Sequence, residues 1–148
     1  MSDTDWRAHL LETPEQVHAL LARTRRIAVL GIKVKESREA AYNVPAYVQR
    51  AGFEVVPVPV YYPDVTEILG QPVYRTLVDI PGEIDMVNVF RRPKHIPAHI
   101  DDILAKRPTS VWFQLDIRHD AAAEQLARAG IDVVQDRCIM IDLAAMGK

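Results

Sequence analysis

Hydrophobic and polar positions divide the 148-residue chain into two kinds of segment. Short apolar runs, typical of parallel strands that are covered on both faces, alternate with longer segments that have the spacing of amphipathic helices. The apolar runs predict strands at residues 26–31, 53–58, 83–91, 109–115 and 131–136, and the helical spacing predicts helices at 13–24, 40–52, 97–107 and 119–130. Because strands that alternate with helices form right-handed crossovers, we expect a doubly wound α/β fold, with a mostly parallel sheet and helices on both faces.

Local signals set the ends of two of these helices. Thr13, Pro14 and Gln16 have the order of a capping box, in which proline occupies the first helical position. Gly52 is placed to end the helix predicted at 40–52. We expect Pro45 to lie in the first turn of that helix, because a proline farther along would remove a hydrogen bond and kink it.

The order of the strands predicts where a ligand binds. We predict that the short segment QPVY, at residues 71–74, is an edge strand and the third strand of the common order 3-2-1-4-5-6. That order has its switch point between the strands at 26–31 and 83–91. Ligands of open α/β sheets bind beyond the carboxyl ends of the strands at such a point.

Three loops converge on this switch point, and two of them are rich in cations. The first contains Gly31, Ile32, Lys33, Lys35, Ser37 and Arg38, the second contains Val58 and Pro59, and the third contains Phe90, Arg91 and Arg92. Arginine side chains match phosphate oxygens, and the amino end of the helix near Ala41 adds partial positive charge. The pattern therefore predicts a phosphate site.

A simpler interpretation of the same cations is open at this stage. Lys33, Lys35 and Arg38 alternate with Glu36 and Glu39 in the sequence, as in an ordinary solvated loop. The two arginines could instead pair with Asp85 or Asp116. Surface ion pairs contribute only about 0–1 kcal/mol, so a stabilising role accounts for them less well than ligand binding does.

Composition restricts the kind of anion and the kind of protein. The chain has 18 Lys+Arg and 20 Asp+Glu residues, a net charge of −2, which argues against a nucleic-acid-binding protein. Cys138 is the only cysteine, which excludes an intramolecular disulfide and fits a reducing, cytoplasmic compartment. Without a leader pattern or an apolar run of about 20 residues, no export or membrane segment is expected. We expect one domain over residues 1–148, in which residues 1–13 are an N-terminal extension.

The phosphate site does not have the pattern of an NAD site. The loop after Leu30 lacks G-x-G-x-x-G, and the second strand ends in VVPVPVYY without the acidic residue that binds the adenosine ribose. A ligand with a phosphate near that ribose suits the cations better. NADP and coenzyme A (CoA) both carry one, so the residues alone leave both open.

Several motifs, in their order and spacing, resemble a known family. They are IAVLG followed by a polar loop and Tyr42, AGFEVVPV, EILGQPVYRTLVDIP, IDMVNVFRRPKHIP and VWFQLDIRHDAAAEQLARAGIDVVQDRC. Over roughly residues 14–143 the chain resembles the stand-alone CoA-binding proteins. Their Rossmann-like fold is similar to that of the CoA-binding domain of succinyl-CoA synthetase alpha subunits.

The resemblance implies a site for CoA or an acyl-CoA. The phosphates would lie against the first loop, the adenosine against the end of the second strand, and the opposite wall would come from the third loop and beyond. The residues so implied are Gly31, Ile32, Lys33, Ser37, Arg38, Tyr42, Val58, Pro59, Phe90, Arg91, Arg92, Gln114 and Ile117.

The chain departs from the family pattern at two of these positions and at one neighbouring position. Pro59 replaces an asparagine, Lys33 replaces a serine, and Asp116 replaces a glycine near the expected ligand. A carboxylate at that position would repel a pyrophosphate unless Arg118 or Lys33 paired with it.

No catalytic arrangement is found in the sequence. His95 and His99 are spaced for one helix face but lack the glutamate of HExxH, so no metal is predicted, and no G-x-S-x-G is present. We interpret the protein as a CoA or acyl-CoA carrier, sensor or partner subunit. The alternatives are an NADP-dependent or CoA-using enzyme and a nucleotide-responsive interaction module. A homodimer or another protein partner is left open, and the loop at 59–71, with Tyr61 and Tyr62, is predicted to cover the ligand.

Overall fold

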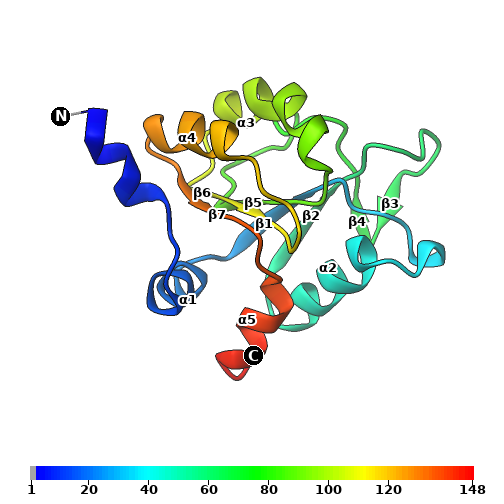
Figure 1. The fold of residues 1–148 in the computed structure, drawn as a ribbon. Helices are drawn as coiled ribbons and strands as arrows, with labels where there is room; N and C mark the ends of the chain where they lie inside the picture. The colour runs from blue at the N-terminus through cyan, green and yellow to red at the C-terminus, as the bar shows by residue number, and fades with distance from the viewer. Residues whose placement is uncertain (1–2) are drawn as a thin grey trace.

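A parallel sheet of five strands forms the centre of the molecule (Figure 1). The computed structural model describes residues 3–148, with side chains from residue 5 onward. In spatial order the strands are β2 (Glu54–Val58), β1 (Arg26–Leu30), β5 (Met86–Val89), β6 (Ser110–Phe113) and β7 (Asp132–Val134). All neighbouring pairs are parallel, which confirms the predicted doubly wound α/β fold and its switch point between β1 and β5.

Helices cover both faces of the sheet (Figure 1). On one face lie α3 (Ile100–Lys106) and α4 (Asp120–Arg128), and on the other lie α1 (Pro14–Ala22), α2 (Ala40–Arg50) and α5 (Ile139–Ala145). Alternate strand residues therefore enter two separate cores: Ala28 and Leu30 pack with the first, Ile27 and Val29 with the second. Burial on both faces explains why the strands read as continuous apolar runs.

Three short 3₁₀ segments complete the helical structure of residues 3–148. They are η1 (Asp3–His9), η2 (Lys35–Ser37) and η3 (Pro93–His99). The helix predicted at 97–107 is therefore shorter than expected, because its beginning belongs to η3, which contains two prolines.

The predicted ends of α1 and α2 are confirmed. The Thr13 hydroxyl accepts a hydrogen bond from the Gln16 amide at 3.2 Å, and the Gln16 side chain accepts one from the Thr13 amide at 3.1 Å. These two bonds satisfy backbone donors that the first helical turn leaves without partners. Gly52 follows the C-cap residue of α2 with a φ of +105°, a conformation that glycine adopts without a steric cost.

The predicted place of Pro45 is wrong. Pro45 lies in the interior of α2, beyond the first turn, and is buried. It has no N–H, so the Ala41 carbonyl has no partner within the helix at that position. The Lys33 amide donates to this carbonyl instead, at 3.1 Å. The proline is therefore accommodated by a hydrogen bond from the loop that follows β1.

The predicted role of residues 71–74 as a third strand of the main sheet is also wrong. β4 (Gln71–Pro72) pairs antiparallel with β3 (Glu67–Ile68) in a separate hairpin. Leu69 and Gly70 join the two strands with φ values of +56° and +74°, as in a tight two-residue turn. The hairpin meets the main sheet where the Tyr74 amide donates to the Pro57 carbonyl at 3.0 Å.

The segment before α1 lies along the opposite edge of the sheet. Leu10 forms a parallel bridge with Val133 of β7, and the Leu11 amide donates to the Val133 carbonyl at 2.9 Å. The guanidinium groups of Arg7 and Arg128 lie over the Trp6 ring, 4.5 and 5.0 Å from its centre. Within residues 3–148, no helix is both long and apolar enough to cross a bilayer.

Candidate functional site

Gly31 brings the three predicted loops together at the switch point. Its amide donates to the Val58 carbonyl at the end of β2, at 2.9 Å. A Cβ atom at this position would lie 2.4 Å from the carbonyl oxygen of Phe90, which follows β5, and the Gly31 φ is +89°. Only glycine permits both this conformation and this close approach. The carboxyl ends of β1, β2 and β5 therefore meet around one residue.

The cations of the first loop differ in their exposure and in their ion pairs. Lys33 is half-buried and its Nζ atom lies 2.7 Å from the Glu39 carboxylate. Lys35 and Arg38 are exposed, and the described part of the chain contains no ion-pair partner for either. Lys33 therefore pairs with an acidic residue of its own loop, as the solvated-loop interpretation expects. The Arg38 side chain is available to a ligand. Arg38 has a φ of +57°, which directs the chain into α2.

The amino end of α2 opens toward this loop without a side-chain cap. Glu39 is the N-cap residue, but its side chain makes no capping hydrogen bond, because its carboxylate pairs with Lys33. The first N–H groups of a helix carry partial positive charge and bind anions. An uncapped helix end beside Lys33 and Arg38 is suited to a phosphate group.

Arg91, in the third loop, has two partners within the described residues. Its Nε atom donates to His99 Nε2 at 3.2 Å, and its Nη1 atom donates to the Tyr61 hydroxyl at 3.3 Å. Arg92 is exposed and has no ion-pair partner in the part of the chain that the structure describes. The alternative pairing of these arginines with Asp85 is not found, because the Asp85 carboxylate accepts from the Arg25 and Arg26 amides at 3.0 and 2.9 Å.

The positive charge gathers around Tyr61. The hydrogen bond and the charge of Arg91 lower the pKa of the Tyr61 hydroxyl, burial acts in the opposite direction, and the charges of Lys33 and Arg92 also lower it. Residues from the first and third loops therefore act on one phenol group. We call Lys33, Arg91 and Arg92 the cation cluster.

Burial and the nearby Arg91 lower the pKa of His99 below its ordinary value, whereas Asp102 acts in the opposite direction. The neutral imidazole can then accept the hydrogen bond from Arg91. Burial and neighbouring cations also lower the pKa of His95. Among the described residues, no group of three or more histidine, cysteine or carboxylate side chains is arranged to hold a metal ion.

The loop that carries Tyr61 is held by Arg75, which the sequence analysis did not identify. The Arg75 guanidinium donates to four carbonyl oxygens of this loop, those of Tyr61, Tyr62, Pro63 and Val65, at 3.1, 2.9, 3.3 and 2.8 Å. No periodic pattern in the sequence signals such contacts, because they depend on the path of an irregular loop.

Some predicted site residues are buried and could shape a site only through their backbone. The Ile32 side chain is 1% exposed and lies in the core beside α2, while Val58 and Pro59 are buried at the end of β2. Gln114 is 4% exposed, and its Oε1 atom accepts from Asn88 Nδ2 at 3.3 Å and from the Ile139 amide at 3.4 Å. The side chain of Gln114 therefore links β5, β6 and α5.

Other predicted residues lie closer to the surface. Ser37, Phe90 and Ile117 are half-buried, and Ile117 packs against the core under α3 and α4. Tyr42 is half-buried and lines a hollow of about 310 Å³ between η2 and the β3–β4 hairpin, together with Val34, Lys35 and Ile68. Glu36 and Glu67 also line this hollow, so it borders the first loop with both apolar and charged side chains.

Asp116 adopts the backbone conformation that a glycine at this position would adopt easily. Its φ is +68°, and its amide donates to the Asp136 carboxylate at 2.7 Å. Neither expected cation pairs with it, because Arg118 lies 3.0 Å from Asp120 and Lys33 pairs with Glu39. The departure from the family pattern thus keeps the local turn and leaves an exposed carboxylate beyond β6.

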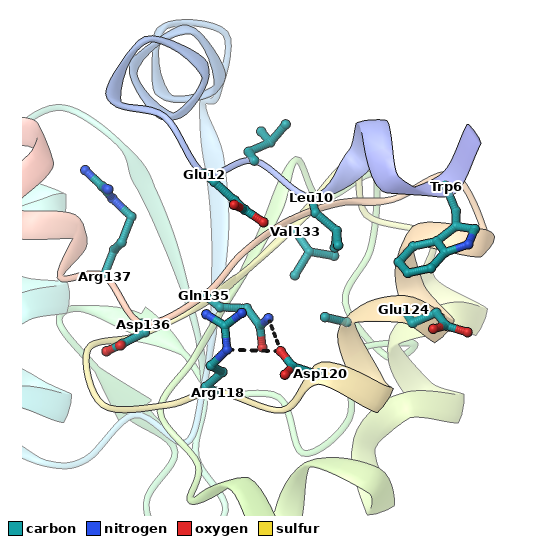
Figure 2. A pocket seen from close by; sticks show the side chains of 12 residues that line it. Trp6, Leu10, Glu12, Arg118, Asp120, Glu124, Val133, Gln135, Asp136 and Arg137 are labelled. Carbon is teal, nitrogen blue, oxygen red and sulfur yellow. Dashed lines mark hydrogen bonds and ion pairs between the residues drawn. The ribbon is translucent and has the colours of Figure 1, made fainter. Parts of the chain in front are cut away.

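A second hollow, of about 500 Å³, lies at the β7 edge and was not predicted (Figure 2). Trp6 and Leu10 line it from the N-terminal segment, and Arg118, Asp120 and Gln135 line it from the other side. Asp120 accepts from Gln135 at 3.1 Å and pairs with Arg118. Because these polar groups satisfy one another and the cation cluster lies elsewhere, we place the candidate site at the β1–β5 switch point.

Comparisons with known proteins place these observations in a family. The family model described as "CoA binding domain" matches residues 25–144. The uncharacterized protein YneT of Bacillus subtilis (strain 168) is 32% identical over 126 residues, which are 85% of this chain and 90% of that protein. The structure of cell-free ID.343 from Thermus thermophilus has 34% identity and a TM-score of 0.82, over 91% of this chain and 99% of that one. A hypothetical protein from Pyrococcus horikoshii OT3 has 30% identity and a TM-score of 0.83, over 93% and 94%.

Proposed function

Because the chain belongs to the CoA binding domain family, we propose that it binds coenzyme A at the carboxyl ends of β1, β2 and β5. The observation that carries this proposal is the cation cluster: Arg91 donates a hydrogen bond to Tyr61 at the switch point, and Lys33 pairs with Glu39 at the uncapped end of α2. CoA has a pyrophosphate and a phosphate on its ribose. A local concentration of positive charge in a chain of net charge −2 suits such a ligand.

The chain's own residues fit different parts of CoA. Arg38 and the amino end of α2 would hold the pyrophosphate, because both present N–H donors beside the loop after β1. The end of β2 would border the adenosine, as in other doubly wound folds. Phe90 and Ile117, which are half-buried, would face the apolar part of the pantetheine arm. Asp116 is exposed nearby and would repel a phosphate, which supports placing the pyrophosphate nearer to α2.

We propose that the protein acts as a carrier, a sensor or a partner subunit for CoA or an acyl-CoA. Residues 1–148 would then form one domain, similar to the CoA-binding domain of succinyl-CoA synthetase. The single cysteine, Cys138, fits a reducing compartment such as the cytoplasm. NADP is the second candidate ligand. One observation favours it: no acidic residue that would bind free ribose hydroxyls lies between the end of β2 and Asp64, and arginines lie nearby.

A thermal-shift panel with CoA, acetyl-CoA, dephospho-CoA, NADP, NAD and ATP tests the proposal. A ligand that binds only the folded state stabilises it by about 2.7 kcal/mol at a hundredfold excess over its dissociation constant. We expect a shift with CoA that is reduced with dephospho-CoA. A shift with NADP alone would favour a reductase, and no shift with any ligand would contradict nucleotide binding.

A further inference from the structure

Tyr61 is an exposed aromatic residue that is held in a defined position at the switch point. Its side chain is 55% exposed, and its hydroxyl accepts from Arg91 Nη1 at 3.3 Å. The Arg91 guanidinium lies over the ring, 5.7 Å from its centre. Tyr61 comes from the loop after β2 and Arg91 from the loop after β5, so this contact joins the two sides of the candidate site.

The contact leaves hydrogen-bond donors available to a ligand. Because the Tyr61 oxygen accepts from Arg91, the hydroxyl hydrogen is free to donate elsewhere. Arg91 uses its Nε atom for His99 and one N–H of Nη1 for Tyr61, so the rest of its planar group can also donate. The phenol and the guanidinium therefore present adjacent donors, as an anion requires.

Arg75 holds the loop in the conformation that places Tyr61 there. Four carbonyl oxygens, from Tyr61 to Val65, accept hydrogen bonds from its guanidinium. Tyr62 has a φ of +63°, a conformation that is unusual for a large side chain and needs support from its surroundings. Without Arg75, the loop would lose these bonds, and the Tyr61 ring would lose its fixed position.

The place of Tyr61 in the fold indicates which part of the ligand it meets. In doubly wound folds, the residues just beyond the second strand of the nucleotide-binding unit contact the adenosine ribose. Here that strand is β2, and the residues that follow it are Pro59, Val60 and Tyr61, with no acidic side chain. A hydroxyl beside an arginine is suited to a phosphate on the ribose, whereas an acidic residue would suit free ribose hydroxyls.

Resting on the proposed function, we propose that Tyr61 distinguishes CoA from dephospho-CoA by donating its hydroxyl hydrogen to the ribose 3′-phosphate beside Arg91. Arg75 acts as a positioning residue for Tyr61. The two ligands differ only in this phosphate, so the ratio of their dissociation constants measures its recognition.

The test is calorimetric titration of the full chain with CoA and with dephospho-CoA. Tyr61→Phe removes one hydroxyl and keeps the ring. Tyr74→Phe is the matched control, because the Tyr74 ring packs against the core under α3 and α4 and its hydroxyl has no hydrogen-bond partner among the described residues. We expect the wild type to prefer CoA and Tyr61→Phe to lower this preference by about tenfold, the effect of one hydrogen bond to a charged group. Tyr74→Phe should keep the wild-type preference.

Arg75→Ala tests the positioning role. We expect the same loss of preference as in Tyr61→Phe, and we expect no additional loss in the double variant, because both changes remove one interaction. A preference unchanged in Tyr61→Phe would overturn the proposal while leaving CoA binding intact. If the wild type bound neither ligand, the proposed function itself would fail, and this inference with it.

Discussion

The amide of Lys33 donates a hydrogen bond to the carbonyl oxygen of Ala41, at 3.1 Å, and this bond joins the loop after β1 to α2. Within a regular helix the Ala41 carbonyl would accept from the residue four positions later. That residue is Pro45, which has no N–H. The proline inside α2 therefore leaves an acceptor that fixes the backbone of a cation-bearing loop.

Replacing Pro45 by alanine should loosen this loop. The new N–H at position 45 competes for the Ala41 carbonyl, so the Lys33 amide should exchange with solvent faster, as measured by hydrogen exchange with NMR detection. The Gly31 amide, which donates to Val58 at 2.9 Å, provides the internal control and should keep its protection. Equal protection of Lys33 in both proteins would contradict this role for the proline.

Replacing Gly31 by alanine should destabilise the protein strongly. The added Cβ would lie 2.4 Å from a backbone oxygen, and the φ of +89° is unfavourable for alanine. We expect a loss of about 2–4 kcal/mol in the free energy of unfolding, measured by urea denaturation. Gly147→Ala is a useful control, because its φ of +80° is similar but no atom lies near the added Cβ. Similar losses in both variants would show that close packing at Gly31 contributes little.

Replacing Glu39 by glutamine should strengthen CoA binding. The Glu39 carboxylate pairs with Lys33 at 2.7 Å and places negative charge at the amino end of α2. Its removal should lower the dissociation constant about two- to fivefold, which corresponds to a surface ion pair of up to about 1 kcal/mol. Calorimetry at low and high salt checks this, since the gain should shrink as salt screens the charges. Weaker binding by the variant would be the opposite of the expected result.

The stability of the protein should depend on pH through His99. Burial and Arg91 lower the pKa of His99, so the unfolded state, with an ordinary value of about 6.5, binds the proton more readily. Stability from the neutral imidazole is present above pH 6.5 and is lost as the pH falls through the lowered pKa. Urea denaturation across this range should show the decline.

His99→Gln should make that decline less steep. A glutamine oxygen can still accept the hydrogen bond from Arg91 and does not take up a proton in this range. His95, whose pKa is also lowered, should keep part of the pH dependence. An identical slope in the wild type and the variant would exclude His99 as its source.

Much of the fold could be predicted from local patterns. The strands of the parallel sheet are apolar because helices cover both faces, and Thr13 with Gln16 has the spacing that a helix start requires. The position of the switch point between β1 and β5 follows from the order of strands and helices, and it survives the wrong assignment of residues 71–74. The prediction for that segment was wrong because Leu69 and Gly70 form a tight turn, so that residues 71 and 72 pair in a separate hairpin.

The candidate site was predicted as a set of loops but not as a set of contacts. The sequence pattern identified Arg91 and Lys33 as cations at the switch point. It did not indicate the contact of Arg91 with Tyr61, or the four bonds of Arg75, because such contacts join residues of different loops and have no periodic signal. Gln114 stays a predicted site residue, and its burial and its hydrogen bonds with Asn88 and Ile139 are contacts that no local sequence pattern signals.

The most direct test of the account is calorimetric titration of CoA into the wild type and into the double variant Arg91→Ala, Arg92→Ala. Arg50→Ala, an exposed arginine at the far end of α2, is the matched control. We predict that the double variant binds CoA at least about tenfold more weakly, whereas the control binds like the wild type. Equal affinity in all three proteins would contradict a CoA site at the β1–β5 switch point.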